Sequence, residues 1–545
     1  MMDAKNYTLG PGDLRRSLMN CCNARMVALL KARGAGGGGG EGATGRGVEG
    51  GGALEEGRAV TVAVVGGSFS LPDHISSHDV WFSLWLKWLT ARYPQAKIKG
   101  INACVGASSA GLSFLCLREM LPEPVDLVFV DYTPNMSPKL EIEAKDLYLE
   151  QLLRALLGRP EQPLVVGIEQ MLPEPVFYKT AEVTTAPLYQ FYDVPWVSVR
   201  NALFHRAAAN KSGFGATQTR IVTGGRAWHY NRRGHRLVAD LAVHFLRAAG
   251  ALAAQGLLGG QEDPFWQDGE EGRAPLHRML RPHPVRRPLG CVLAPQLPRF
   301  VAPASSAGWA YTTDDPNGAK WGFISAYGAR EPPAFNTSGG GGGLPAGVVV
   351  SATPPRLDLE WDPRDFGAGA GSDSGSGDGQ GSGISSTGGD GGGGGSYVFV
   401  LSYLASYAQT GYGNLSCSGA CSCRETSINA YMPEHSLTLV RPVVINFTQP
   451  RPQAEGGGGS VCRVSLANVS PGGRRWKFKV LGFILAELEP GMEADVGLVS
   501  FMWHGGALQK KSPPQAQAQA QAPRRLVGAR APPIASGVTR HHLRV

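Results

Sequence analysis

The stretch AVTVAVVGGSFS, residues 59–70, decides the fold of the first half of the chain. It is a mainly apolar run, rich in β-branched residues, that stops at two glycines. Such a run is typical of a parallel strand buried on both faces and followed by a tight turn. Parallel sheets place their sites at the carboxyl ends of the strands. Ser68, directly after the glycines, therefore lies where a functional site is expected.

The same alternation of strand and helix continues to about residue 250. Helical spacing of apolar residues recurs at 79–94, 110–121, 141–157 and 234–249, and short apolar runs at 96–109, 125–135, 163–171 and 194–204 predict strands between them. Residues 12–34 also have helical spacing and end at Gly34, which predicts a first helix. Strands that alternate with helices indicate an α/β fold, a doubly wound parallel sheet with helices on both faces.

The second half of the chain has a different pattern. Residues 251–295 are rich in Pro, Arg and Gly and predict a linker. Residues 296–504 contain short strand-like pieces without comparable helices, which favours a β-sandwich-like domain. We therefore expect an α/β domain at 6–250, with a Gly-rich insert at 34–57, and a β domain interrupted by further glycine-rich inserts. The chain has 75 glycines, and most of the excess over an average share lies in these runs, a composition typical of disordered segments.

The formal net charge of +8 is concentrated at the end of the chain. Residues 505–545 hold seven Lys or Arg and no acid, which leaves +1 for the rest of the 545 residues. We interpret 505–545 as a basic low-complexity tail. Because no aromatic and basic groove pattern accompanies it, we predict that the protein does not bind nucleic acid. We also predict no transmembrane segment, since no apolar run reaches about 18–20 residues.

Two features favour the secretory pathway or the cell exterior, although the first twenty residues have no hydrophobic core of a signal peptide. The chain has seven Asn-X-Ser/Thr sequons, at Asn6, Asn135, Asn210, Asn336, Asn414, Asn446 and Asn468. Four cysteines, Cys417, Cys421, Cys423 and Cys462, cluster late in the chain. In an oxidising compartment they predict two disulfides, and in a reducing one a four-thiolate zinc site, of which we favour the disulfides. We expect Cys21, Cys22, Cys104 and Cys116 to be buried and inert.

Chemically useful groups stand at successive strand ends. The backbone N–H groups of Ser68 and Gly106 and the side-chain amide of Asn135 are donors that suit a developing oxyanion. His229, in TGGRAWHYNRRGHRL at 223–237, adds a general base. Each residue alone has a structural explanation, such as a tight turn for Gly-Gly-Ser. Together they favour nucleophilic catalysis.

The blocks VVGGSFS, NACVGASS, VDYTPN and HYNRRGH, in this order, resemble the SGNH (GDSL-type) hydrolase family. The resemblance covers roughly residues 6–250. It looks closest to plant and algal members that have Gly-Gly-Ser in the first block and a β-rich extension after the hydrolase domain. The resemblance implies Ser68 as the nucleophile, His229 as the general base, and Ser68, Gly106 and Asn135 as the oxyanion hole. It implies no metal and no organic cofactor.

Three residues depart from the family pattern. Gly67 replaces the Asp of Gly-Asp-Ser, Met136 replaces an acid after Asn135, and Arg226 replaces the Asp of Asp-X-X-His. Only the last bears on mechanism, because a triad carboxylate orients the histidine and stabilises its imidazolium form. We expect either a backbone carbonyl or another acid, such as Asp73 or Asp79, to orient His229.

His235 is the second candidate base in the same stretch. It stands at the start of a predicted helix, where a role in capping or packing that helix is expected.

Two functions follow from these patterns. The first is a serine esterase acting on an acyl ester, such as an O-acetyl group of a polysaccharide. The alternative, which Arg226 motivates, is a catalytically impaired protein of the same fold that binds glycans or serves as a scaffold. For that role the aromatic residues Trp309, Tyr311, Trp321 and Tyr412 are candidates for stacking on sugar rings.

Overall fold

A computed structural model describes the larger part of the chain. The described residues are 18–19, 54, 57–72, 75–106, 108–135, 142–170, 180–223, 226–254, 285–302, 308–313, 321–327, 350–361, 395–406, 409–433, 439–449, 461–471 and 475–489. The basic tail predicted at 505–545 and most of the Gly-rich insert predicted at 34–57 lie outside them.

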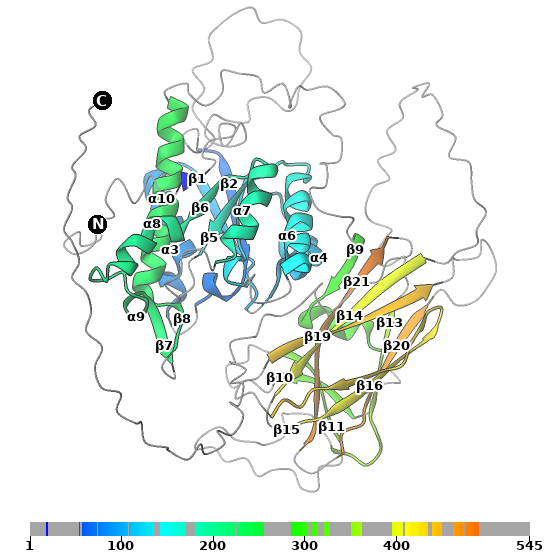
Figure 1. Cartoon of the computed structure of the whole chain (residues 1–545). Helices are drawn as coiled ribbons and strands as arrows, with labels where there is room; N and C mark the ends of the chain where they lie inside the picture. The colour runs from blue at the N-terminus through cyan, green and yellow to red at the C-terminus, as the bar shows by residue number, and fades with distance from the viewer. Residues whose placement is uncertain are drawn as a thin grey trace, which may run out of the picture. The chain divides into compact units, whose positions relative to one another are not determined.

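A six-stranded sheet forms the centre of the first domain (Figure 1). Its strands are β1 (Leu18–Met19), β2 (Ala59–Gly66), β3 (Lys97–Asn102), β4 (Leu127–Asp131), β5 (Leu164–Glu169) and β6 (Trp196–Ser198). Their spatial order is β1-β6-β5-β4-β2-β3, and all pairs are parallel except β1 with β6. The strand with the Gly-Gly-Ser turn, β2, therefore lies between β3 and β4.

Helices cover both faces of this sheet, so the predicted α/β fold with a doubly wound sheet is confirmed. One face packs against α4 (Ala110–Leu115), α5 (Leu117–Met120), α6 (Ile142–Leu157) and α7 (Glu182–Phe191). The other packs against α3 (Trp81–Arg92), α8 (Val199–Ala208) and α10 (Arg232–Ala254), as Figure 1 shows. Side chains of β2 alternate between the two layers: Ala63 and Val65 face the first, and Val62 and Val64 the second. This double burial explains the continuous apolar run.

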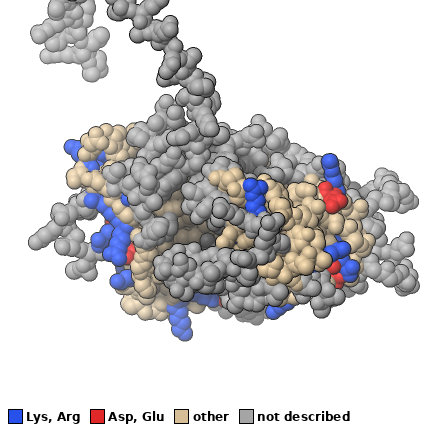
Figure 2. Space-filling model, turned by 90° about the horizontal axis from the view of Figure 1, so that it is seen from below, with Lys and Arg blue, Asp and Glu red and all other residues tan. Residues whose placement is uncertain are grey.

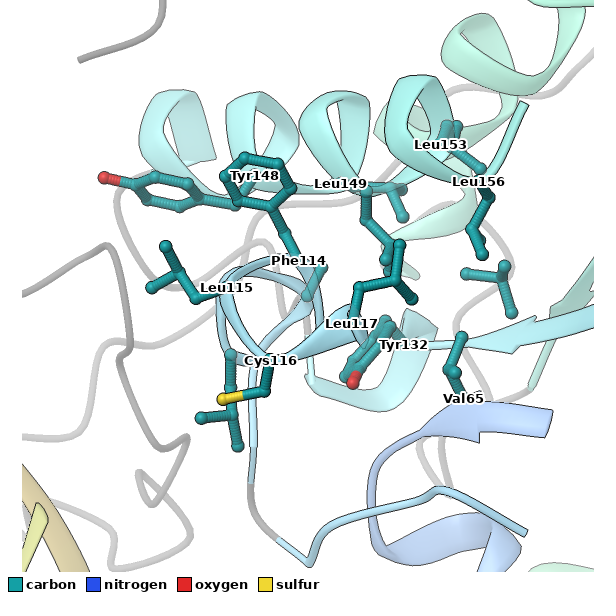
Figure 3. Packing of buried hydrophobic residues seen from close by; sticks show 14 of the residues in the cluster. Val65, Phe114, Leu115, Cys116, Leu117, Tyr132, Tyr148, Leu149, Leu153 and Leu156 are labelled. Atoms are coloured by element: carbon teal, nitrogen blue, oxygen red, sulfur yellow. The ribbon is translucent and has the colours of Figure 1, made fainter. Parts of the chain in front are cut away.

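The apolar residues predicted to line one face of the helix at 141–157 form the buried face of α6. Leu149, Leu153 and Leu156 point from α6 toward the sheet, while Tyr148 lies beside Phe114 of α4 (Figure 3). Their spacing of three, four and seven residues is that of one helix face.

One predicted helix is wrong at the residues that the structure describes. Leu18 and Met19, inside the helix predicted at 12–34, form strand β1, whose backbone pairs antiparallel with Val197 and Trp196. The unpaired edge of β6 offers hydrogen bonds that override a helical pattern in this segment.

The second domain is built of two further sheets. The larger has β9 (Val285–Val292), β10 (Trp309–Thr313), β11 (Trp321–Tyr327), β12 (Val350–Ser351), β14 (Gly395–Ala405), β15 (Gln409–Thr410), β17 (Ser422–Cys423), β19 (Leu439–Gln449) and β21 (Arg475–Leu488). The smaller has β13 (Arg356–Trp361), β16 (Tyr412–Gly419), β18 (Thr426–Asn429) and β20 (Cys462–Asn468). Pairing is antiparallel apart from β11 with β12 and β15 with β21. Side chains of both sheets share one core, in which Trp361 stacks on Phe399 at 5.3 Å, so the predicted sandwich is present.

The domain boundaries of the sequence analysis remain predictions, but the linker at 251–295 contains structure. Helix α10 continues to Ala254, and β9 pairs with β21 in the larger sheet. Pro288 is tolerated in β9 because the pairing there is irregular.

Three disulfides are present among the described residues. Cys417 bonds to Cys423 and Cys421 to Cys462, the two-disulfide alternative for the late cysteines. The expectation that Cys116 is an inert buried thiol is wrong: this residue, directly after α4, bonds to Cys291 of β9. A partner 175 residues away leaves no local pattern in the sequence. Cys104 is a free thiol, and Cys21 and Cys22 lie outside the described residues.

Two residues expected at the surface are buried. Trp309, a candidate for sugar stacking, is 7% exposed and packs edge-on against Phe478. Asn468, one of the sequon asparagines, is fully buried and donates from Nδ2 to the hydroxyl of Ser325. Neither is available in the folded domain to a sugar or a glycosylating enzyme.

Charged side chains on the face shown in Figure 2 lie in small separate groups, with acidic residues beside several of the basic ones. None of the helices in the described part of the chain is long and apolar enough to cross a membrane.

Gly66 is required by close packing at the end of β2. A Cβ atom there would lie 2.5 Å from the carbonyl oxygen of Asp131, a backbone atom that cannot move aside. We predict that Gly66→Ala destabilises the first domain by about 1–3 kcal/mol, the usual cost of overpacking, and lowers its Tm in calorimetry by several degrees.

The matched control is Gly250→Ala in α10, where a Cβ would meet no atom within 4 Å. Because alanine favours helix over glycine, this variant should be equal to the wild type or more stable by up to about 1 kcal/mol. Equal Tm values for Gly66→Ala and the wild type would contradict the packing argument.

Candidate active site

The turn after β2 presents Ser68 at the carboxyl edge of the sheet. The N–H of Gly67 donates to the carbonyl of Asp131 at 3.1 Å, which continues the pairing of β2 with β4 one residue beyond the strand. The chain then turns through the single 3-10 turn η1 (Ser68–Ser70), in which Ser68 remains half-buried. The serine therefore stands on a fixed turn next to open space.

The other predicted residues, Gly106 and Asn135, follow the two strands that flank β2. The N–H of Val105 donates to the carbonyl of Gly66 at 3.0 Å, so the exposed Gly106 follows the end of β3 beside the serine turn. On the other side of β2, Asn135 ends the turn η3 (Thr133–Asn135) that follows β4. The side chain of Asn135 lies outside the described residues. Ser68, Gly106 and Asn135 thus lie just after the ends of three neighbouring strands, β2, β3 and β4.

His229 reaches this edge from outside the parallel sheet. It lies in β8 (Arg226–Tyr230), which forms a separate two-stranded hairpin with β7 (Arg220–Thr223), so the expectation that it stands at a sheet strand end is wrong. Its Nε2 lies 2.7 Å from the hydroxyl oxygen of Ser68. That distance is within the range required between a nucleophile and its base.

The residues proposed to orient His229 are only partly described. The backbone of Arg226 pairs with Thr223 in the hairpin, whereas its side chain and the whole of Asp73 lie outside the described residues. The carboxylate of Asp79 forms an ion pair with Arg232, at 2.9 Å. Asp79 therefore anchors the start of α10.

His235 has the structural role that its position in a helix predicts. It is 1% exposed, and its Nδ1 accepts the backbone N–H of Trp81 at 3.2 Å, which joins α10 to the start of α3. Burial, followed by the nearby His229 and Arg220, lowers the pKa of His235 to about 3. A neutral, buried imidazole that already accepts a hydrogen bond is unsuited to act as the base.

A buried polar network beneath the serine turn was missed from the sequence. Trp81 donates from its indole nitrogen to the hydroxyl of Ser70 at 2.7 Å, and that hydroxyl donates to Asp131 Oδ2 at 2.6 Å. Gln170 donates to the same carboxylate oxygen at 2.9 Å, and Asn102 Nδ2 donates to the carbonyl of Ser70 at 2.8 Å. The network ties η1 to β3, to β4 and to helix α3. The one signal in the sequence is an acid at the end of the apolar strand LVFVD.

The network contains an acid whose pKa is raised toward neutral pH. Asp131 is fully buried, and burial raises its pKa to about 7, although hydrogen bonds from Ser70 and Gln170 lower it. Its Oδ1 has no hydrogen-bond partner among the described residues. The carboxyl of Glu169 is similar: Thr133 donates to it at 2.7 Å, and burial together with the nearby Glu182 raises its pKa.

The described residues hold no cluster of three or more His, Cys, Asp or Glu side chains that could bind a metal ion.

Asp131 makes a specific contribution to the pH dependence of stability. Its pKa is about 4 in the unfolded chain and about 7 in the fold, so between these values the folded state binds more protons. Stability from this group is complete below pH 4 and is lost as the pH rises to 7. We predict that Asp131→Asn removes this part of the slope, worth about 1.4 kcal/mol for each pKa unit.

The measurement is urea unfolding, followed by tryptophan fluorescence, of wild type and Asp131→Asn at intervals from pH 4.5 to 8. Relative to the wild type, the variant should become more stable as the pH rises from 4.5 to 8. Parallel curves over this range would show that Asp131 does not titrate in the fold.

Comparisons with known proteins give likeness of structure only. No protein-family model matches the chain, and no curated protein matches it. A solved two-domain esterase active on acetylated mannans is similar at 14% identity and a TM-score of 0.49, over 80% of this chain and 93% of the esterase. An acetylxylan esterase from Geobacillus stearothermophilus is similar at 14% identity and a TM-score of 0.28, over 34% of this chain and 94% of its own. Neither likeness assigns this chain to a family.

Proposed function

We propose that this protein is a serine esterase of the SGNH type that hydrolyses acyl esters, with O-acetyl groups on a glycan as the substrate class. The observation that carries the proposal is the 2.7 Å contact between Ser68 Oγ and His229 Nε2. It joins residues 161 positions apart at the carboxyl edge of a parallel sheet, which is where such folds place their sites.

The reaction follows from these positions. Ser68 Oγ attacks the ester carbonyl carbon while its proton passes to His229 Nε2, and the carbonyl oxygen becomes an oxyanion. The N–H groups of Ser68 and Gly106 and the amide of Asn135 would hold that oxyanion. His229 then donates its proton to the leaving alcohol oxygen, which gives an acyl-enzyme. Water, deprotonated by His229, attacks the acyl-enzyme and releases the acid and Ser68.

The described disulfides fit the compartment expected from the sequence. Three pairs, one of which joins Cys116 to Cys291, favour an oxidising environment such as the secretory pathway or the cell exterior.

The first test is active-site labelling. We expect the wild type to react with a fluorophosphonate probe and to hydrolyse p-nitrophenyl acetate, and Ser68→Ala to lose both. The loss of turnover should reach up to about 10⁶-fold, the scale seen when the nucleophile of a serine protease is removed. Ser77→Ala, at an exposed serine in the neighbouring turn η2 (Ser77–Asp79), is the matched control and should behave as the wild type. Folded wild type that neither reacts nor turns over would overturn the esterase proposal and favour the glycan-binding alternative.

Arg226 supplies the second test, because it stands where the family pattern has the orienting acid. In a protease the loss of that acid costs up to about 10⁴-fold in rate. We predict that Arg226→Asp raises kcat/KM for p-nitrophenyl acetate by about 10-fold or more, since a carboxylate would stabilise the imidazolium form of His229.

Arg226→Ala separates the two parts of this change, since it removes the cation without adding a carboxylate. A gain confined to Arg226→Asp supports a triad geometry. If the two variants have the same activity, the carboxylate has no role and the prediction is wrong.

A further inference from the structure

Arg220, the first residue of β7, is an arginine buried next to the catalytic pair. It is 2% exposed, and its guanidinium carbon lies 4.4 Å from the ring centroid of Tyr230 and 5.3 Å from that of Phe69. Burial lowers the pKa of Arg220, as expected for a cation removed from water. Arginine is seldom fully buried without a role for its side chain.

The two rings beneath the guanidinium belong to the neighbours of the reacting residues. Phe69 directly follows Ser68, and Tyr230 directly follows His229. Phe69 also meets both Tyr230 and the imidazole of His229 edge-on, at 5.4 Å and 5.2 Å between centroids. We call Arg220, Phe69, Tyr230 and His229 the arginine–aromatic cluster.

The arginine is fixed to the hairpin by its own backbone. Arg220 pairs with Tyr230 across the hairpin, and its carbonyl accepts the side-chain amide of Asn231 at 3.3 Å. The N–H of Asn231 donates to the carbonyl of Thr219 at 3.0 Å. The base and Arg220 therefore form one unit, and contact of the guanidinium with Phe69 joins this unit to the serine turn.

Charge does not explain why an arginine stands here. Removing a cation from water costs free energy, and the positive charge by itself does not recover it. The guanidinium, however, lies over both the Tyr230 ring and the Phe69 ring, which are nearly perpendicular to each other. It thereby bridges two aromatic side chains, for which its broad planar group is better suited than the compact ammonium group of lysine. The benefit is therefore one of geometry.

We propose that Arg220 is a positioning residue which, by bridging the rings of Phe69 and Tyr230, holds the Ser68 turn and the His229 strand at hydrogen-bonding distance. The inference rests on the proposed esterase function. Because an error of 1 Å in placement can cost about 10²-fold in rate, loss of this bridge should lower the rate of the chemical step.

The test compares Arg220→Lys, Arg220→Met and Phe69→Leu with the wild type. The measured quantities are kcat and KM for p-nitrophenyl acetate, the rate constant of fluorophosphonate labelling, and the Tm. We expect kcat and the labelling rate to fall about 10-fold or more in each folded variant while KM changes little, because the ester itself contacts none of these side chains in the proposal. Arg220→Lys should fall with Arg220→Met, since charge alone does not restore the bridge.

Arg92→Met is the matched control. It removes an exposed arginine that lies 5.0 Å from the ring centroid of Tyr93, at the far end of α3, and should leave kcat unchanged. Wild-type kcat in Arg220→Lys and Arg220→Met, or a loss in Arg220→Met alone, would overturn the geometric role.

If Arg220→Met does not fold, Arg220→Lys, Phe69→Leu and their double variant decide the question. Shared positioning predicts that the double variant is no slower than the slower single variant, whereas multiplying losses would overturn the inference. An inactive wild type would overturn the esterase function itself, and with it this inference. An active wild type with unaffected Arg220 variants would overturn the inference alone.

Discussion

The hydrogen bond from the N–H of Gly67 to the carbonyl of Asp131 is the constraint on which the site depends. It carries the pairing of β2 and β4 past the last strand residue and fixes where the serine turn begins. Gly66 must be a glycine for this approach, because a Cβ would lie 2.5 Å from the same carbonyl. The carboxylate of Asp131 accepts a hydrogen bond from the hydroxyl of Ser70, and that hydroxyl accepts one from the indole N–H of Trp81. Ser68 is thus placed by backbone geometry first and by buried hydrogen bonds second.

His229 is held in position by a different kind of contact. His229 lies on a hairpin that shares no strand with the parallel sheet, so its position relative to Ser68 depends on side-chain contacts. Two sets of contacts act here. The backbone N–H of Trp81 donates to His235 of α10 on one side, and Phe69 meets the rings of His229 and Tyr230 on the other. Both sets of contacts reach η1, the first through the hydrogen bond from Trp81 to Ser70 and the second through Phe69. The serine turn therefore contacts the elements that hold Ser68 and those that hold His229.

Burial changes the pKa of three ionisable groups in the first domain. Asp131 and Glu169 have raised pKa values, which leaves them largely neutral at mildly acidic pH, and His235 has a lowered one, which leaves it neutral as well. Burial is the largest cause in each case. Burying these groups in their neutral forms costs less free energy than burying them charged, since an uncharged group loses less hydration free energy on leaving water.

The sequence by itself determined the fold class and most of the strands and helices of the first domain, and it singled out Ser68 and His229, whose side chains lie in contact. These follow from local patterns: a continuous apolar run reports a strand buried on both faces, and a serine after two glycines reports a turn at its end. Only the tertiary structure decided the rest: that Leu18 and Met19 complete the sheet edge, that Cys116 bonds to Cys291, that His229 lies on a hairpin, and that Arg220 bridges Phe69 and Tyr230. Each of these joins residues more than one hundred positions apart, except for the hairpin and the contact of Arg220 with Tyr230. Which residues pair in this way depends on packing in three dimensions, and the periodicity of the sequence does not predict it.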